Sequence, residues 1–237
     1  MIKTTINTLR LVRAFTMKMI KPKENYFFAT RSLRPLSRKF GFDRGTPIDR
    51  YYIDKFLVDN KAKIKGKCLE IGDNRYTKKY GASKVKISDI LDIDKKNKNA
   101  NIHANLKNLK ILKSNLYDCI ILTHVLGMID DYEAAIGESK RILKPSGTLL
   151  VTISCFSPTH DINANFFRFT VTSARYVFAK YFDKKNLFVK SYGNVLAGQC
   201  FWVGMAQEEL TKKELEFNDP NYPCIVAIRA IKSPKKS

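Results

Sequence analysis

Residues 67–75, Lys-Cys-Leu-Glu-Ile-Gly-Asp-Asn-Arg, decide the fold. The apolar run on either side of Glu70 is typical of a central parallel strand, which packs on both of its faces. Gly72 marks the end of the strand, where a glycine permits a sharp turn and the close approach of a ligand. Glu70 places a carboxylate near the carboxyl edge of the sheet, where open α/β folds bind ligands. The sequence predicts a ligand site at this edge; the alternative is a Glu70 that only caps a neighbouring loop.

Strand and helix patterns alternate along the rest of the chain. Residues 117–123 form a strongly apolar strand, and residues 130–143 a helix with Asp130 as its cap. Further strands are predicted at residues 84–88, 101–106, 148–154, 187–191 and 222–231, and further helices after Thr46 and at 76–80, 170–182 and 195–215. Such alternation predicts a doubly wound, mostly parallel α/β sheet with helices on both faces.

The length and composition indicate a single domain. The chain has 237 residues, of which 44% are hydrophobic, enough for one sizeable core. Residues 45–231 are expected to form this domain, residues 1–44 a basic N-terminal leader and residues 232–237 a solvated tail.

Part of the net charge of +21 comes from the leader, which contains eleven Lys and Arg residues and only two acidic residues, Glu24 and Asp43. Apolar residues spaced three or four apart between Ile6 and Met19 suit a basic amphipathic helix on an anionic membrane surface. A solvated leader is the alternative. Nucleic acid is not an expected partner, because no stretch outside the N-terminus interleaves basic and aromatic residues.

The cysteines and histidines indicate neither a disulfide framework nor a metal centre. The five cysteines include no Cys-x-x-Cys pair, and the three histidines lack metal-ligand spacing. We therefore expect no metal and a reducing, cytoplasmic setting. No apolar run approaches the roughly 20 residues that a membrane-spanning helix needs.

An acid at the end of the second predicted strand is the next candidate for a ligand contact. In nucleotide-binding α/β sheets, an Asp or Glu there accepts hydrogen bonds from ribose hydroxyls. The strand pattern ends at Asp89, which is therefore the first candidate, and Asp92 is the alternative.

Several motifs together resemble class I S-adenosylmethionine-dependent methyltransferases across about residues 45–231. They are the acid and glycine after the first strand, the acid after the second, the string Asp-Cys-Ile-Ile-Leu-Thr at 118–123, and Arg-Ile-Leu-Lys-Pro-Ser-Gly at 141–147. Longer strings at residues 43–53, 167–170, 191–196 and 219–223 are similar to a narrower bacterial group. That group accompanies glycosyltransferases of surface-polysaccharide biosynthesis.

The resemblance implies a seven-stranded sheet with an antiparallel last strand and S-adenosylmethionine as cofactor. By position it assigns Glu70, Gly72 and Asp73 to the methionine and ribose part, Asp89 to the ribose, Asn105 and Leu106 to the adenine, and Thr123 and His124 to the reacting centre. Two usual glycines are replaced by Asn74 and Tyr76, and Asn105 stands where an Asp is usual.

The function expected from this resemblance is methyl transfer to a hydroxyl of a sugar or glycan precursor. His124 is the first candidate for a general base, with a structural histidine as the alternative, and His160 is a second candidate. Tyr192 and Asn194 are candidates for the acceptor pocket or for a turn. Methylation of another substrate, including RNA, and a non-catalytic binding protein remain the competing functions.

Overall fold

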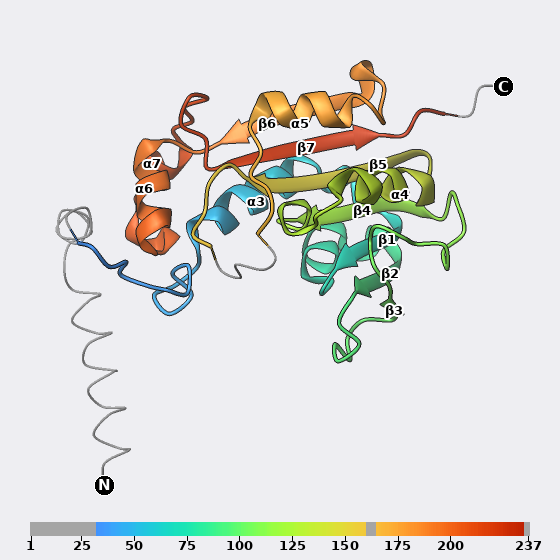
Figure 1. The fold of residues 1–237 in the computed structure, drawn as a ribbon, viewed down its shortest axis with the longest axis horizontal. Helices are drawn as coiled ribbons and strands as arrows, with labels where there is room; N and C mark the ends of the chain where they lie inside the picture. Colours follow the sequence, from blue (N-terminus) through green and yellow to red (C-terminus); the bar gives the residue numbers. More distant parts are fainter. Residues whose placement is uncertain (1–31, 160–164, 235–237) are drawn as a thin grey trace, which may run out of the picture. The chain divides into compact units, whose positions relative to one another are not determined.

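The computed structural model describes residues 32–159 and 165–234 (Figure 1). The described residues form two compact units: residues 32–51 with Gly193–Tyr222, and Tyr52–Tyr192 with residues 223–234. The second unit contains the sheet, and the first is built mostly of short helices.

The larger unit is organised around a seven-stranded sheet with the order β3-β2-β1-β4-β5-β7-β6. Strands β1 to β5 run parallel to one another, whereas β7 is antiparallel to both β5 and β6. The strands are β1 (Gly66–Ile71), β2 (Val85–Asp92), β3 (Ile102–His103), β4 (Tyr117–Thr123), β5 (Leu143–Ser154), β6 (Leu187–Tyr192) and β7 (Ile225–Ile231). The predicted mostly parallel sheet with an antiparallel last strand is confirmed.

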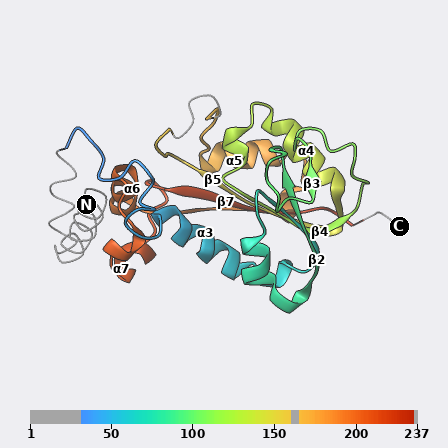
Figure 2. The same ribbon diagram turned by 90° about the horizontal axis from the view of Figure 1, so that it is seen from below.

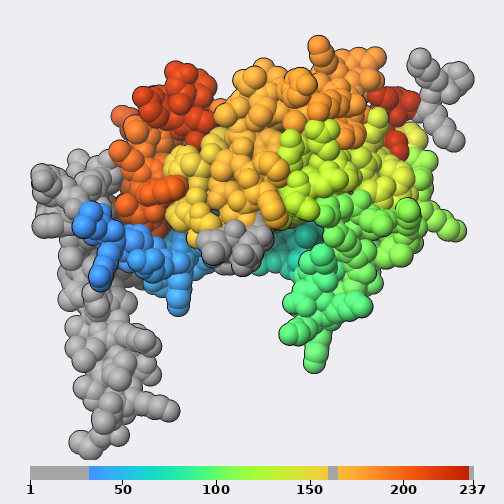
Figure 3. Space-filling model, viewed as in Figure 1, coloured from blue at the N-terminus to red at the C-terminus, as the bar shows by residue number. Residues whose placement is uncertain are grey.

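Helices cover both faces of this sheet. Figure 2 shows α4 (Tyr132–Ile142) and α5 (Val171–Phe178) on one face, while α3 (Ile48–Asp59) lies on the other from Tyr52 onward. The ion pair between Lys180 and Glu133 at 2.7 Å joins the segments of α5 and α4, which lie next to one another on the surface (Figure 3). The shorter helices of this unit are η1 (Lys61–Lys63), η2 (Thr77–Gly81), η3 (Ala82–Lys84), η4 (Leu126–Met128) and η5 (Lys184–Asn186).

Strand β5 begins at Leu143, earlier than the sequence pattern indicates. Leu143 pairs with Tyr117 of β4, so the Lys-Pro-Ser-Gly segment is part of the strand and not a turn before it. A Cβ on Gly147 would lie 2.8 Å from the carbonyl oxygen of Lys144 and 3.0 Å from that of Tyr117. The close approach of these backbones requires glycine at this position.

Arg141 ties the end of α4 to the loop before β4. Its guanidinium donates hydrogen bonds to the carbonyl oxygens of Leu109 at 2.8 Å and Leu112 at 2.9 Å. Its Nε also donates to Glu138 at 2.7 Å, which accepts from the Leu109 amide in turn. The planar guanidinium can satisfy all these acceptors at once, which the single ammonium of a lysine cannot do.

We expect Arg141→Ala to lower the free energy of unfolding by about 1–3 kcal/mol, because two carbonyl groups and a carboxylate lose a charged donor. Urea titration measures the effect. Arg141→Lys should recover only part of the loss, and full recovery would contradict the role of the guanidinium geometry.

The helix caps agree with the sequence at α5 and differ at α4. Thr170 caps α5 by accepting from the amide of Ser173, as predicted. At α4 the cap is Asp131, whose side chain accepts from the amide of Ala134 at 2.9 Å, so the prediction of Asp130 was wrong by one residue.

The smaller unit holds α6 (Val195–Val203), η6 (Gln207–Glu209) and α7 (Lys212–Glu216). Asn194 caps α6 by accepting from the Ala197 amide at 2.9 Å, and its amide donates to the carbonyl oxygens of Glu214 at 2.7 Å and Phe217 at 2.8 Å. These bonds show a structural role for Asn194, which corresponds to the turn interpretation of this residue.

Part of the predicted leader contacts the smaller unit. The amide of Leu36 donates to the carbonyl oxygen of Val203 at 2.8 Å, and Arg44 donates from Nε to Glu209 at 2.9 Å. The predicted amphipathic helix lies outside the described residues. No helix in the described ranges combines the length and the apolar character that crossing a lipid bilayer requires.

Candidate functional site

The tip of β1 is open at Gly72. This residue has a φ of +77°, and a Cβ built on it would meet nothing within 4 Å. Its amide donates to the carbonyl oxygen of Leu91 at 2.9 Å, which holds the tip against β2. The backbone conformation requires glycine, and the space beside it leaves the backbone accessible to a ligand.

Glu70 is buried below this opening and holds the loop that follows it. Its side-chain oxygens accept hydrogen bonds from the amides of Tyr76 at 3.2 Å and Thr77 at 2.7 Å. Burial raises the pKa of Glu70 to about 7, although the bonds from these amides partly oppose the rise. In the structure the carboxylate therefore caps the loop, and the predicted cofactor contact of Glu70 stays a prediction.

Glu70→Gln is expected to flatten the pH dependence of stability between about pH 4.5 and 7. The raised pKa means that the folded chain binds more protons than the unfolded chain in this window. The contribution of Glu70 to stability is therefore present at low pH and falls as the pH rises to about 7. Urea titrations across this range should show the difference, and parallel curves for both chains would contradict it. The exposed Glu216→Gln is the control.

Asp89 lies inside β2 and not at its end, because the strand continues to Asp92. Its oxygens accept hydrogen bonds from Asn101 at 2.7 Å and from the Tyr117 hydroxyl at 2.8 Å, and Lys67 lies 3.1 Å away. Burial disfavours its charged form, but these partners outweigh burial and lower the Asp89 pKa. Asp89 thus joins β2 to β1 and β4 within the sheet.

Asp92 is the acid at the carboxyl edge. Asn97 donates from its side-chain amide both to Asp92 at 2.7 Å and to the carbonyl oxygen of Gly72 at 2.7 Å. The other oxygen of Asp92 accepts from the amide of Asp94 at 2.9 Å. Asn97 therefore holds the tips of β1 and β2 together, with the half-buried Asp92 beside the opening at Gly72.

The remaining predicted adenine and loop residues occupy turns after the strands. Asn105 accepts at its side chain from the amide of Lys107 at 3.0 Å, and Leu106 is buried in the core. Strand β3 is shorter than predicted and ends before both residues. Asp73 accepts from Nε of Arg75 at 2.7 Å, within the loop after β1.

His124 follows Thr123 at the end of β4 and is turned toward β5. Its φ is +57°, a conformation that is uncommon for residues other than glycine and that clusters at functional sites. The His124 amide donates to the carbonyl oxygen of Thr152 at 2.8 Å, and Nδ1 lies 3.0 Å from Oγ of Ser154. In the tautomer with a proton on Nδ1, Ser154 accepts that proton's hydrogen bond and Nε2 keeps its lone pair.

The structure brings several predicted candidates to one edge. The carboxyl ends of the parallel strands β1, β2, β4 and β5 carry Gly72, Asp92, His124 and Ser154. Sequence reasoning missed Asn97, which reaches Gly72, 25 residues away, and Ser154, which lies 30 residues from His124. His160 lies outside the described residues. Within residues 32–159 and 165–234, no group of His, Cys, Asp or Glu side chains could hold a metal ion.

Solved structures with a similar fold include methyltransferases. A SAM dependent methyltransferase from Archaeoglobus fulgidus has 14% identity and a TM-score of 0.51, with 77% of this chain and 90% of that chain covered. A putative sarcosine dimethylglycine methyltransferase from Galdieria sulphuraria has 14% identity and a TM-score of 0.50, with 80% and 90% covered. The [4+2]-cyclase SpnF has 10% identity and a TM-score of 0.51, with 77% and 80% covered. At these identities the similarity shows the fold alone.

The sequence itself identifies the family. No curated protein matches the chain. A family model described as a methyltransferase domain matches residues 26–187, which is more than half of the chain. Together with the strand order and the open edge at Gly72, this match shows that the chain belongs to the methyltransferase-domain family of enzymes.

Proposed function

We propose that this enzyme transfers a methyl group from S-adenosylmethionine to a hydroxyl of a sugar or glycan precursor. The observation that carries the cofactor part is the open glycine tip of β1 beside the carboxylate of Asp92, in a chain of the methyltransferase-domain family. The cofactor supplies a methyl group on a positively charged sulfur, and the protein supplies position and any base.

The residues at the edge fit a nucleoside with free ribose hydroxyls. Asp92 has carboxylate oxygens at the end of β2, where ribose hydroxyls donate in nucleotide-binding sheets. Asn97 keeps Asp92 and the Gly72 backbone in place. We therefore assign the ribose contact to Asp92, which is half-buried at the end of β2, in place of Asp89, which is buried inside the strand.

The hydroxyl acceptor is supported by the pair of His124 and Ser154. A hydroxyl attacking a methyl group must lose its proton, and a neutral imidazole can take it. The contact of 3.0 Å orients the imidazole, and with Nδ1 donating to Ser154 the unprotonated nitrogen is Nε2, which is buried. The positive φ of His124 is a backbone conformation that costs free energy for a residue other than glycine, which is in keeping with a functional position.

The sugar or glycan acceptor rests on the resemblance of sequence strings, such as residues 43–53 and 219–223, to the polysaccharide-associated group. Methylation of another substrate, including RNA, is the second candidate, favoured by the net charge of +21. Methyl transfer from labelled S-adenosylmethionine to nucleotide sugars, glycan fragments and RNA separates these acceptors. Transfer to RNA alone would overturn the glycan proposal, and transfer to none would favour a binding protein.

Asp92→Asn should weaken the binding of S-adenosylhomocysteine by about 1–3 kcal/mol, the usual cost of losing a hydrogen bond to a charged group. Calorimetry measures the affinity. Asp89→Asn is the matched variant: it should lower the unfolding free energy through its contacts with Tyr117 and Lys67 and leave the affinity nearly unchanged. The opposite pattern would return the ribose contact to Asp89.

His124→Asn is expected to lower turnover by about 10²–10⁴-fold with little change in affinity for S-adenosylhomocysteine, because a general base contributes in this range. Wild-type turnover should fall as the pH is lowered, because an imidazolium cannot accept a proton. Ser154→Ala should cause a smaller loss, because the imidazole remains but is less well oriented. Unchanged turnover in His124→Asn would exclude a base at this position.

A further inference from the structure

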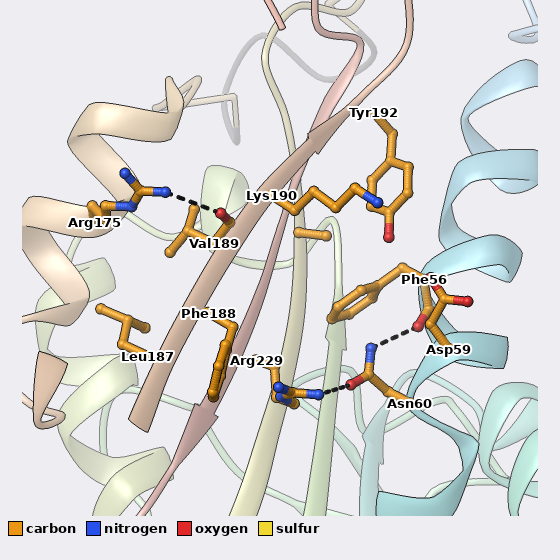
Figure 4. Close-up of a pocket in the computed structure, with 11 residues that line it drawn as sticks. Phe56, Asp59, Asn60, Arg175, Leu187, Phe188, Val189, Lys190, Tyr192 and Arg229 are labelled. Carbon is orange, nitrogen blue, oxygen red and sulfur yellow. Dashed lines mark hydrogen bonds between the residues drawn. The ribbon is translucent and has the colours of Figure 1, made fainter. Parts of the chain in front are cut away.

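A second concave surface lies along β6 and β7, with residues of α3 on one side and Arg175 of α5 across β6 (Figure 4). Its volume is about 520 Å³, within the range of small-molecule sites. Side chains of the two strands form the floor, and Phe56, Asp59 and Asn60 of α3 form the facing wall. We call this surface the β6 groove; Tyr192, a predicted acceptor-pocket candidate, is its one lining residue that the sequence associates with methyl transfer.

Arg229 is held in a fixed position in the β6 groove. Its NH1 donates to Oδ1 of Asn60 at 3.1 Å, and Asn60 is itself held by a bond from Nδ2 to the carbonyl oxygen of Phe56 at 2.8 Å. The guanidinium carbon lies 4.0 Å from the ring centroid of Phe188 (Figure 4). A guanidinium fixed in this way loses little entropy when it binds an anion.

The positive charge of the groove is not balanced by its own residues. Arg175, Lys190 and Arg229 line it, and none of the three forms an ion pair within the described part of the chain. Asp59 is the only carboxylate among the lining residues. It lies by the Tyr192 phenol, whose pKa is raised to about 12 by burial and then by the charge of Asp59.

The aromatic side chains add a flat surface to this cationic groove. Phe188 is 48% exposed although it lies in a strand, and Nζ of Lys190 lies 4.9 Å from the ring centroid of Tyr192. The exposed Phe188 ring beside these cations suits a ligand that combines an anionic group with an apolar or planar body, whereas Tyr192 is buried.

The edge of β6 favours a small ligand over a partner strand. Arg175 donates from NH2 to the carbonyl oxygen of Val189 at 3.3 Å, so a backbone acceptor of β6 already has a partner. A strand adding to this edge would have to displace that bond and bring its own donors to a cationic surface.

We propose that the β6 groove binds a small organic anion, with its phosphate or carboxylate between Arg229 and Lys190 and its flat body against Phe188. The site is separate from the cofactor edge and does not depend on the reaction proposed above. Phosphate esters and carboxylic acids share the required chemistry.

The test uses the full chain saturated with S-adenosylhomocysteine, with phenyl phosphate and benzoate as probes in separate titrations followed by backbone amide NMR. We expect shifts in the amides of β6 and β7 around Phe188 and Arg229, and weaker binding of inorganic phosphate because it lacks the ring. Arg229→Gln should weaken the binding of the better probe by at least about tenfold, the loss that follows from removing a charged donor.

Two further variants keep the test decisive. Lys190→Gln alters only an exposed side chain and should also weaken binding, even if Arg229→Gln folds poorly. Lys86→Gln removes an exposed charge on β2 and should leave the affinity unchanged. Equal losses in Lys86→Gln and Lys190→Gln, shifts confined to the cofactor edge, or no binding of either probe would overturn the proposal. The probe that binds more tightly identifies the anionic group.

Discussion

The structure of the candidate site depends on the burial of one carboxylate. Glu70 is only 2% exposed, and a buried charged group is costly unless hydrogen bonds compensate for its lost hydration. The amides of Tyr76 and Thr77 supply those bonds, and in doing so they fold the loop after β1 back onto the strand. The loop therefore leaves the backbone of Gly72 uncovered.

A strand with both faces buried is among those that the sequence predicted well. Strand β4 has the predicted bounds, because a continuous apolar run can only be satisfied inside a parallel sheet. The end of β2 was predicted at Ser88, because Ser88 and Asp89 look like the polar end of a strand. The strand in fact continues to Asp92. Asp89 remains inside the sheet because Tyr117 and Lys67 reach it from other strands. No local pattern shows partners that are distant in the sequence. Asp92, the acid at the end of β2, was therefore predicted only as the alternative to Asp89 for the ribose contact.

The same limit explains which site residues were missed. Asn97 belongs to a run of lysines and asparagines that looks like a solvated loop, yet its side chain joins the Gly72 backbone to Asp92. Ser154 reaches His124 because β4 and β5 pair with Thr123 opposite Thr152, and because His124 adopts a positive φ. The sequence indicates where each strand ends, but the meeting of two side chains depends on register and on a backbone angle that no pattern encodes.

Arg175, which donates to the Val189 carbonyl oxygen, places a positive charge at the outer edge of β6. Within the described residues β6 pairs only with β7, so its other edge is a template on which a second copy could polymerise. Such an encounter would bring Arg175 and Lys190 of both copies together, and their mutual repulsion opposes self-association. Salt screens this repulsion over a Debye length of about 10 Å at 0.1 M. We therefore expect contact between copies through the edge of this sheet to increase with ionic strength, because salt weakens the repulsion that opposes it.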